Sequence, residues 1–356
     1  METEKSLSSY HFNIPEDAGI LVTGGGGFVG RKIVNILCRK RLRVVTFSRS
    51  LYPYLDDLGV KQVQGDLADL EAICEALQGC SLVFHVAAKA GIWGTYRDFY
   101  RSNVFGTENV IEGCFKQGID RLVYTSSPSV VFNGKDMEGV DESTPYAVRF
   151  NASYPATKAM AERRVLEANS SKLATVAIRP HLIWGPGDTH IIPGLLKRAS
   201  RGQLRRLGRR EKKVDFTYID NAVHAHLLAA ERLFPGSPIS GRSFFITDDS
   251  PIPIWMFINK ILNVAGLPLV EKTVSPGLAY LVATMVEVVH WLLQLKSEPR
   301  LTRFLVEEMS TAHWFDVNAA KECLGYQPVV DLETGMKRVA VWLSKTIDSP
   351  CSKGLM

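Results

Sequence analysis

The chain has 356 residues, of which 46% are hydrophobic and 22% charged, so it is long enough to bury a large core as one α/β domain or two smaller ones. Its net charge of +5 is mild, most of its basic residues are dispersed, and no nucleic-acid-binding motif accompanies them, which argues against a nucleic-acid-binding protein. The six cysteines have no paired CxxC spacing, so they are predicted to be reduced thiols. The sequence contains no cluster of metal-ligand residues, so no metal site is predicted.

Residues 1–17 contain no apolar run of signal-peptide length and are predicted to be a flexible tail. From there to residue 184, short β-branched runs alternate with amphipathic stretches of helical length. The runs cover 19–24, 43–48, 61–66, 81–88, 121–127 and 173–180. This alternation predicts a Rossmann-type, doubly wound parallel sheet over residues 18–184, with helices on both faces.

After residue 184 the alternation loosens, and Pro, Gly and basic residues interrupt it. We therefore expect residues 185–345 to form a smaller substrate-binding region. The run "RSFFITD" at 242–248 is expected to return a strand to the main sheet, and residues 346–356 to form a C-terminal tail.

The first predicted strand leads into a glycine-rich turn, "TGGGGFVG", in which Gly24, Gly27 and Gly30 flank Phe28. Glycine is required where a turn is tight and where backbone must approach a pyrophosphate at a helix N-terminus. A glycine-rich turn without a ligand is the plainer alternative, but its position at the first strand-to-helix turn favours dinucleotide binding.

The end of the second predicted strand bears on the choice of dinucleotide. An acid there accepts hydrogen bonds from a ribose hydroxyl, whereas an arginine can pair with a 2′-phosphate. The residues are Ser48, Arg49 and Ser50, with no acid, so NADP is the predicted cofactor and NAD the alternative. Arg49 could equally be a solvated surface charge.

The motif "SYPATK" sets Tyr154 and Lys158 one helical turn apart, on the same face if a helix begins here. Oxidation of a secondary alcohol needs a base for the hydroxyl proton, and an ammonium next to a phenol favours the phenolate. Ser127, at the end of the fifth predicted strand, could hold the substrate oxygen. A YxxxK pattern alone also arises by chance; the glycine turn and the serine-bearing strand end support the catalytic interpretation.

These motifs occur together with others, namely "GDL" (65–67), "HVAA" (85–88), "NVFGTENV" (103–110), "YTSS" (124–127) and "RPHLIWGPGD" (179–188). The combination resembles an extended short-chain dehydrogenase/reductase. "VDFTYIDNAVHAHLLAAE", "FFITDDSPIPIWMF" and "LGYQPVVDLETGM" extend the resemblance to the 3β-hydroxysteroid dehydrogenase branch, with most similarity to the sterol-4α-carboxylate 3-dehydrogenases (decarboxylating). It spans most of residues 19–345.

The resemblance implies Tyr154 as general acid/base, Lys158 bonding the nicotinamide ribose and lowering the pKa of the tyrosine, and Ser127 orienting the reacting oxygen. The further implied cofactor contacts are Asp66 and Leu67 beside the adenine, Ala87 and Ala88 beside the ribose and phosphates, Asn103 near the catalytic helix, and the backbone after Pro180 at the nicotinamide carboxamide. One departure is Ser48, where this branch often has an acid.

The most apolar stretch, residues 278–295, is interrupted by Glu287 and His290. It is a marginal transmembrane segment by length and charge. A core helix and a helix that dips into a membrane surface are the alternatives, and Lys296, Arg300 and Arg303 follow as candidate headgroup contacts. The basic stretch at 196–213 is expected to be a solvated face, or else to contact acidic lipid or the cofactor phosphate.

The predicted function is the NAD(P)-dependent oxidation of the 3β-hydroxyl of a steroid or sterol to a 3-ketone, with loss of carbon dioxide if the substrate is a 4-carboxysterol. The alternatives are a nucleotide-sugar epimerase or carbonyl reductase on the same core, and a non-catalytic dinucleotide-binding protein. The predicted location is the cytosolic face of the endoplasmic reticulum membrane, or else the cytoplasm. Homodimer formation, the direction of reaction and a Δ5–Δ4 isomerisation stay open.

Overall fold

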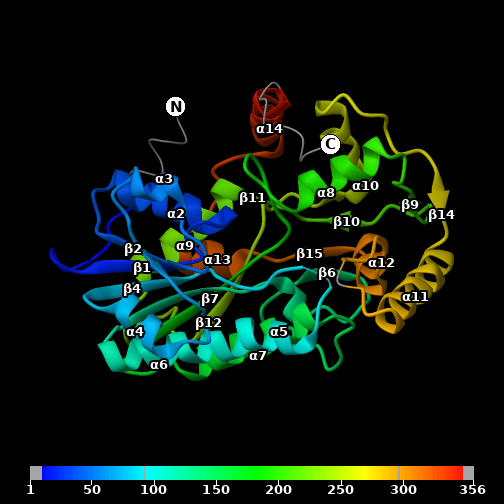
Figure 1. The fold of residues 1–356 in the computed structure, drawn as a ribbon. Coiled ribbons are helices and arrows are strands. Elements are labelled where there is room, and N and C mark those ends of the chain that lie inside the picture. The colour runs from blue at the N-terminus through cyan, green and yellow to red at the C-terminus, as the bar shows by residue number, and fades with distance from the viewer. Residues whose placement is uncertain (1–9, 92, 296, 348–356) are drawn as a thin grey trace.

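The computed structural model describes residues 10–91, 93–295 and 297–347, and a parallel sheet of seven strands forms its centre (Figure 1). In chain order the strands are β1 (Gly19–Thr23), β2 (Val44–Ser48), β3 (Lys61–Gln64), β4 (Cys80–His85), β5 (Arg121–Thr125), β7 (Ala174–Pro180) and β12 (Arg242–Ile246). Their order in space is β12-β7-β5-β4-β1-β2-β3. The predicted Rossmann-type fold is therefore confirmed, and the strand expected at 242–248 pairs in parallel with β7.

Helices cover both faces of this sheet because alternate strand residues point to opposite faces. Ile20 and Val22 of β1 belong to one core, with residues of α2 (Phe28–Arg39) and α9 (Ile219–Arg232). Leu21, between them, belongs to a second core. That core also contains residues of α4 (Leu70–Leu77), α6 (Gly106–Gln117) and α7 (Ser153–Glu167). The strands are almost continuously apolar because both of their faces are buried.

Of the remaining elements, most gather at the carboxyl ends of the strands, whereas α13 (Asn318–Leu324) packs against α9 and β12 (Figure 1). The others are α3 (Pro53–Asp56), α5 (Tyr96–Phe99), the π-helix η1 (Tyr100–Phe105), η2 (Pro128–Val130), β6 (Met137–Val140), β8 (Ile183–Trp184), α8 (Ile191–Ser200), β9 (Arg206–Leu207), β10 (Lys213–Val214), β11 (Thr217–Tyr218), β13 (Ile252–Pro253), α10 (Ile254–Val264), β14 (Thr273–Val274), α11 (Pro276–Leu292), α12 (Arg303–Ser310), β15 (His313–Phe315) and α14 (Leu332–Ile347). A small sheet of order β13-β10-β15-β6 joins the two halves of the chain. β6 lies before residue 184 but pairs with β15, and β12 lies after it but pairs with β7. Strand pairing therefore connects the two predicted regions, and the division at residue 184 stays a prediction.

The described part of the N-terminal segment packs against the body of the protein. Tyr10 is 4% exposed, and its carbonyl oxygen accepts a hydrogen bond from Lys40 Nζ at 2.6 Å. Asn13 O accepts a hydrogen bond from Arg121 Nη2 at 2.9 Å. Residues 1–9 and 348–356, which make up much of the two predicted tails, lie outside the described residues.

The apolar stretch predicted at 278–295 forms α11, at the edge of the molecule and away from the central sheet (Figure 1). Only Ala279 and Ala283 of this helix are buried, whereas Met285 and Trp291 are 57% and 74% exposed. The interpretation as a core helix is therefore wrong. Among the described residues, no helix combines the length and apolar character needed to cross a bilayer. Lys296 lies outside the described residues.

Candidate active site

A cavity of about 1490 Å³ opens at the carboxyl ends of the parallel strands. It includes the crevice between β1 and β4, where the strand order reverses and doubly wound sheets bind their ligands. All but one of the predicted site residues line it: Gly24, Gly27, Phe28, Gly30, Ser48, Arg49, Asp66, Leu67, Ala87, Ala88, Ser127, Tyr154, Lys158 and Pro180. The exception is Asn103.

The turn between β1 and α2 tolerates no side chain at two of its glycines. Gly24 has a φ of +68°, and a Cβ there would lie 3.0 Å from the Cα of Ala87. A Cβ on Gly30 would lie 2.2 Å from the carbonyl oxygen of Gly24. The N-cap residue of α2 is Gly27, so no side chain caps the first amides of this helix. Bare backbone next to a helix N-terminus fits the pyrophosphate of a dinucleotide.

The end of β2 carries a buried polar atom without a partner. Ser48 Oγ forms no hydrogen bond among the described residues. Arg49 is exposed, and its carbonyl oxygen accepts a hydrogen bond from Gln64 Nε2 at 2.9 Å. A buried hydroxyl without a partner can form a hydrogen bond with a polar group of a ligand, so the end of β2 also fits a nucleotide.

Asn103 lies in η1 and is buried beside the cavity wall rather than in it. Its Oδ1 accepts a hydrogen bond from Lys89 N at 2.7 Å, and its Nδ2 donates to Thr157 Oγ1 of α7 at 3.1 Å. The side chain thus ties the loop after β4 to the helix that carries Tyr154. This proximity to α7 matches the position implied by the sequence.

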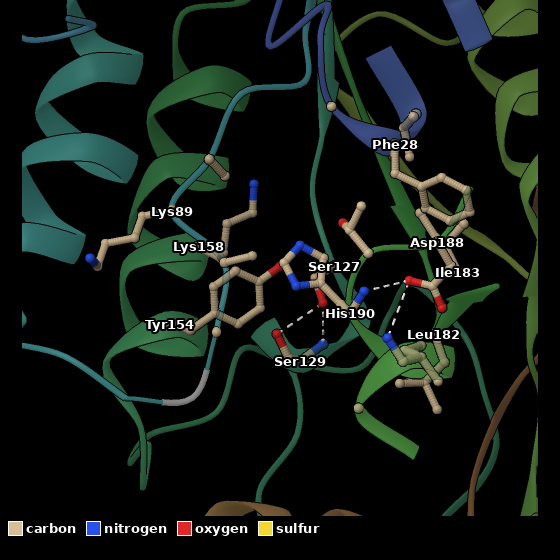
Figure 2. Close-up of a pocket in the computed structure, with 18 of the residues that line it drawn as sticks. Phe28, Lys89, Ser127, Ser129, Tyr154, Lys158, Leu182, Ile183, Asp188 and His190 are labelled. Atoms are coloured by element: carbon tan, nitrogen blue, oxygen red, sulfur yellow. Dashed lines mark hydrogen bonds between the residues drawn. The ribbon is translucent and has the colours of Figure 1, made fainter. Parts of the chain in front are cut away.

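Tyr154 and Lys158 lie one turn apart at the start of α7, and Ser127 follows β5. Figure 2 shows all three side chains projecting into the same part of the cavity. Ser127 Oγ is 3.0 Å from Ser129 Oγ and accepts a hydrogen bond from Ser129 N at 3.2 Å. Lys158, only 2% exposed, donates from Nζ to Tyr124 Oη at 2.7 Å and to Thr125 O at 2.6 Å.

Burial dominates the proton equilibria of the pair. It raises the pKa of Tyr154 to about 12, with a smaller rise from the charge of Glu308, while the Ser127 hydroxyl opposes the shift. It lowers the pKa of Lys158 to about 7, against the favourable charge of Glu162. The expected lowering of the tyrosine pKa by Lys158 is therefore not found, because burial raises this pKa and Lys158 does not contribute to the shift. Desolvation disfavours both charged forms, and the ammonium hydrogen-bonds elsewhere.

Two buried polar groups near the site were not assigned from the sequence. His85, within the quoted "HVAA", bonds Thr23 Oγ1 at 2.7 Å and Thr107 Oγ1 at 2.9 Å. Burial, with a smaller contribution from Lys158, lowers its pKa to about 3, so its ring is neutral and held between two hydroxyls. The signal available in the sequence was a histidine at the end of an otherwise apolar strand.

The second missed group is an ion pair that involves α7, the helix that carries Tyr154 and Lys158. Arg179 Nη2 lies 2.5 Å from Glu162 Oε1, and the two side chains are 3% and 0% exposed. Tyr146 Oη donates to the same carboxylate at 2.7 Å. Glu162 lies one turn beyond Lys158, so the i+4 spacing along α7 was the available signal.

Part of the outer wall of the cavity is apolar and includes Ile254 and Phe257 of α10 and Phe304 of α12. Glu308 lies one turn after Phe304, and burial raises the pKa of its carboxyl to about 7, with a smaller rise from Glu307. The cavity lining also contains the charged residues Lys197, Arg198, Arg201 and Arg300. The apolar part suits the hydrocarbon portion of a ligand.

A model of the 3-beta hydroxysteroid dehydrogenase/isomerase family matches residues 21–276. The 2-alkyl-3-oxoalkanoate reductase of Stenotrophomonas maltophilia is 47% identical over 322 residues, which cover 90% of this chain and 98% of that protein. The sterol-4-alpha-carboxylate 3-dehydrogenase, decarboxylating, of Mus musculus is 37% identical over 324 residues, covering 89% and 88%. MoeE5 in complex with UDP-glucose and NAD has a TM-score of 0.72 at 24% identity, covering 93% and 100%, which shows the fold alone.

The predicted location at the endoplasmic reticulum membrane is contradicted. Two relatives at 47% and 46% identity come from bacteria, which have no endoplasmic reticulum. The predicted family is confirmed, because its model matches most of the chain and the sterol-4-alpha-carboxylate 3-dehydrogenases align over nearly all of it. The chain therefore belongs to the 3-beta hydroxysteroid dehydrogenase/isomerase family and is a nicotinamide-dinucleotide-dependent oxidoreductase.

Proposed function

We propose that this protein interconverts the hydroxyl and the ketone of a lipophilic acid in which the reacting carbon is next to the carbon that bears the carboxylate. The activities named for two relatives support this substrate unit. A 2-alkyl-3-oxoalkanoate and a sterol-4-alpha-carboxylate oxidised at carbon 3 share it, although their carbon skeletons differ. The observation that carries the proposal is the projection of Ser127, Tyr154 and Lys158 into a cavity with a partly apolar outer wall.

Each of the three residues has a role that its surroundings support. The Tyr154 phenol, with its pKa raised to about 12, is protonated near neutral pH and can donate its proton to a carbonyl oxygen. In the opposite direction the same oxygen accepts the proton of the hydroxyl. Ser127 would hold the substrate oxygen in line with the phenol. The nicotinamide, when bound, supplies or accepts the hydride, and Lys158 would hold its ribose.

The cofactor we propose is NADP, with Ser48 and Arg49 recognising its 2′-phosphate. An exposed guanidinium and an unpartnered buried hydroxyl, with no acid at the end of β2, support this preference. The glycine turn serves NAD equally well, so only the end of β2 favours NADP.

A 3β-hydroxysterol with or without a 4-carboxylate is the second candidate substrate. The sterol-4-alpha-carboxylate 3-dehydrogenase of Mus musculus and the apolar side chains of α10 and α12 favour it. A nucleotide-sugar substrate is less well supported, because the solved structure with UDP-glucose is only 24% identical and is similar in fold alone. We also propose that α11 contacts a membrane surface, since its exposed side chains include Leu278, Leu281 and Trp291.

The test is an assay of the purified protein with racemic 2-hexyl-3-hydroxydecanoate and with a 3β-hydroxy-4-carboxysterol, following NADPH and NADH absorbance. We expect turnover of the lipophilic hydroxy acid and a higher kcat/KM with NADP⁺. Tyr154→Phe should lower kcat by roughly 10²–10⁴-fold while cofactor binding persists.

The matched control is Tyr96→Phe, which removes the hydroxyl of a tyrosine that is 50% exposed and outside the cavity lining. Full activity of Tyr154→Phe would reject the assigned acid/base. Turnover of neither acid would reject the substrate class, and a strong NAD preference would reject the role of Arg49.

A further inference from the structure

A carboxylate next to the reacting carbon needs its own partner in the cavity, close to the phenol of Tyr154. Its carbon is two carbon–carbon bonds from the carbon that carries the reacting oxygen, so a binding group must face the space beyond Ser127 and Tyr154. An anion left without a donor in a cavity with partly apolar walls would be costly. The carboxylate therefore requires a hydrogen-bond donor that points into this space and has no other hydrogen-bond acceptor.

Two nearby cations do not meet this requirement. Lys158 Nζ already donates to Tyr124 Oη and Thr125 O. Lys89 Nζ lies 5.3 Å from the ring centre of Phe99, and Figure 2 shows its amine pointing away from Tyr154. Further cations line other parts of the cavity, namely Lys197 and Arg198 of α8, Arg201 directly after it, and Arg300 before α12. Glu308 has the wrong charge.

Among the residues labelled in Figure 2, His190 is a donor whose ring lies on the side of Tyr154 and Ser127. Figure 2 shows its side chain reaching from the loop before α8 toward Tyr154 and Ser127. The residue is exposed within the cavity lining, and its ring forms no hydrogen bond among the described residues. An imidazole carries at least one N–H donor in either protonation state.

The backbone of His190 is held by a buried carboxylate. Asp188, 3% exposed, accepts hydrogen bonds from His190 N at 2.7 Å and Ile191 N at 3.2 Å through Oδ1, and from Ile192 N at 2.8 Å through Oδ2. These bonds use the first amides of α8, so the imidazole and not the helix N-terminus is the available donor. They also fix the point from which the ring extends.

We propose that His190 binds the substrate carboxylate and thereby selects 3-hydroxy and 3-oxo acids over neutral alcohols and ketones. The inference rests on the proposed function, which supplies the carboxylate. The ring donates an N–H to one carboxylate oxygen and so orients the neighbouring carbon toward Tyr154 and Ser127. His190 acts in recognition, and the proton of the reaction stays with Tyr154.

The experiment compares 2-hexyl-3-hydroxydecanoate with its methyl ester, both oxidised with NADP⁺, since the ester keeps the shape and lacks the charge. The hydroxy acid is used because the corresponding oxo acid loses carbon dioxide readily. The wild type should prefer the acid in kcat/KM. His190→Ala should reduce this acid-to-ester preference by roughly 10–100-fold, as expected for a hydrogen bond to a charged group.

His190→Gln, whose amide can still donate, should recover part of the preference. Thr189→Ala, at the adjacent position of the same loop, should leave it unchanged. Equal loss of kcat/KM for acid and ester in His190→Ala, or no loss for either, overturns the role of His190 and leaves the proposed function standing. Failure of the wild type with both compounds overturns the proposed function, and the carboxylate site with it.

Discussion

Tyr154, Lys158 and Glu308 share one cavity, and burial shifts the pKa of each toward its neutral form. The pKa of Tyr154 rises to about 12, that of Lys158 falls to about 7 and that of Glu308 rises to about 7. The cause is the same for all three, because a low-dielectric pocket disfavours charge of either sign. Near neutral pH, therefore, small changes in pH alter the charge that a substrate meets there.

This predicts a pH effect that depends on Glu308. As pH rises through about 7, the carboxyl ionises; its charge raises the pKa of Tyr154 and repels an anionic substrate. Lys158 loses its proton in the same range, and Glu307 adds to the shift at Glu308. The titrations of Tyr154 and Lys158 are common to both proteins, so the ratio of kcat/KM for the hydroxy acid in Glu308→Gln to that in the wild type should increase as pH rises through about 7, because only the wild type gains the carboxylate charge.

The measurement is kcat/KM against pH for the wild type, Glu308→Gln and Glu322→Gln, an exposed carboxylate on α13 that serves as the control. Identical profiles for the wild type and Glu308→Gln would show that this carboxyl does not influence the reaction.

At the level of elements, α11 differs from every helix that covers the main sheet. It packs against α12, where Glu287 pairs with Arg303 at 2.7 Å, and its buried residues are Ala279 and Ala283. Most of its other side chains are apolar and exposed, which is unusual for a surface helix unless it meets a partner. This is the physical basis of the proposed contact with a membrane surface.

The prediction is that the protein floats with vesicles of phosphatidylcholine and phosphatidylglycerol in a density gradient. Trp291→Glu and Leu292→Glu together should weaken binding at least roughly tenfold, because each side chain contributes about 1.5–3 kcal/mol when buried. Val341→Glu, which changes a 55% exposed residue on α14, is the matched control. A wild-type protein that stays at the bottom of the gradient would refute the contact.

For the whole molecule, the buried pair of Glu162 and Arg179 joins helix α7, which carries Tyr154 and Lys158, to strand β7. Neither side chain reaches solvent, so removing one leaves the other charged and unpaired in the interior. Breaking such a pair typically costs 3–5 kcal/mol, far more than breaking an exposed pair. The same carboxylate favours the charged form of Lys158, so it couples the stability of the fold to the site.

Glu162→Gln should lower the free energy of unfolding by about 3 kcal/mol or more, measured by urea denaturation. Glu112→Gln breaks the pair with Lys116, in which both side chains are 53% exposed, and should cost no more than about 0.5 kcal/mol. Equal unfolding midpoints for the two variants would mean that the buried pair contributes no more than the surface one.

The sequence by itself determined the seven strands of the main sheet, the glycine turn and the spacing of Tyr154 and Lys158. These are local properties: continuous apolar runs follow from burial on both faces, and glycine from a turn in which a Cβ would collide with backbone. Only the tertiary structure decided what came together from distant parts of the chain. It brought Glu308 of α12 near Tyr154 of α7, and His190 opposite the same phenol.

Two further properties also required the tertiary structure. The direction of the Tyr154 pKa shift depends on how completely the surroundings remove water, which one helical turn of sequence does not specify. The exposure of α11 was equally hidden, since an apolar helix looks alike in sequence whether a core, a membrane or solvent surrounds it. Local pattern sets which elements form, whereas burial, and with it charge and exposure, is a property of the assembled fold.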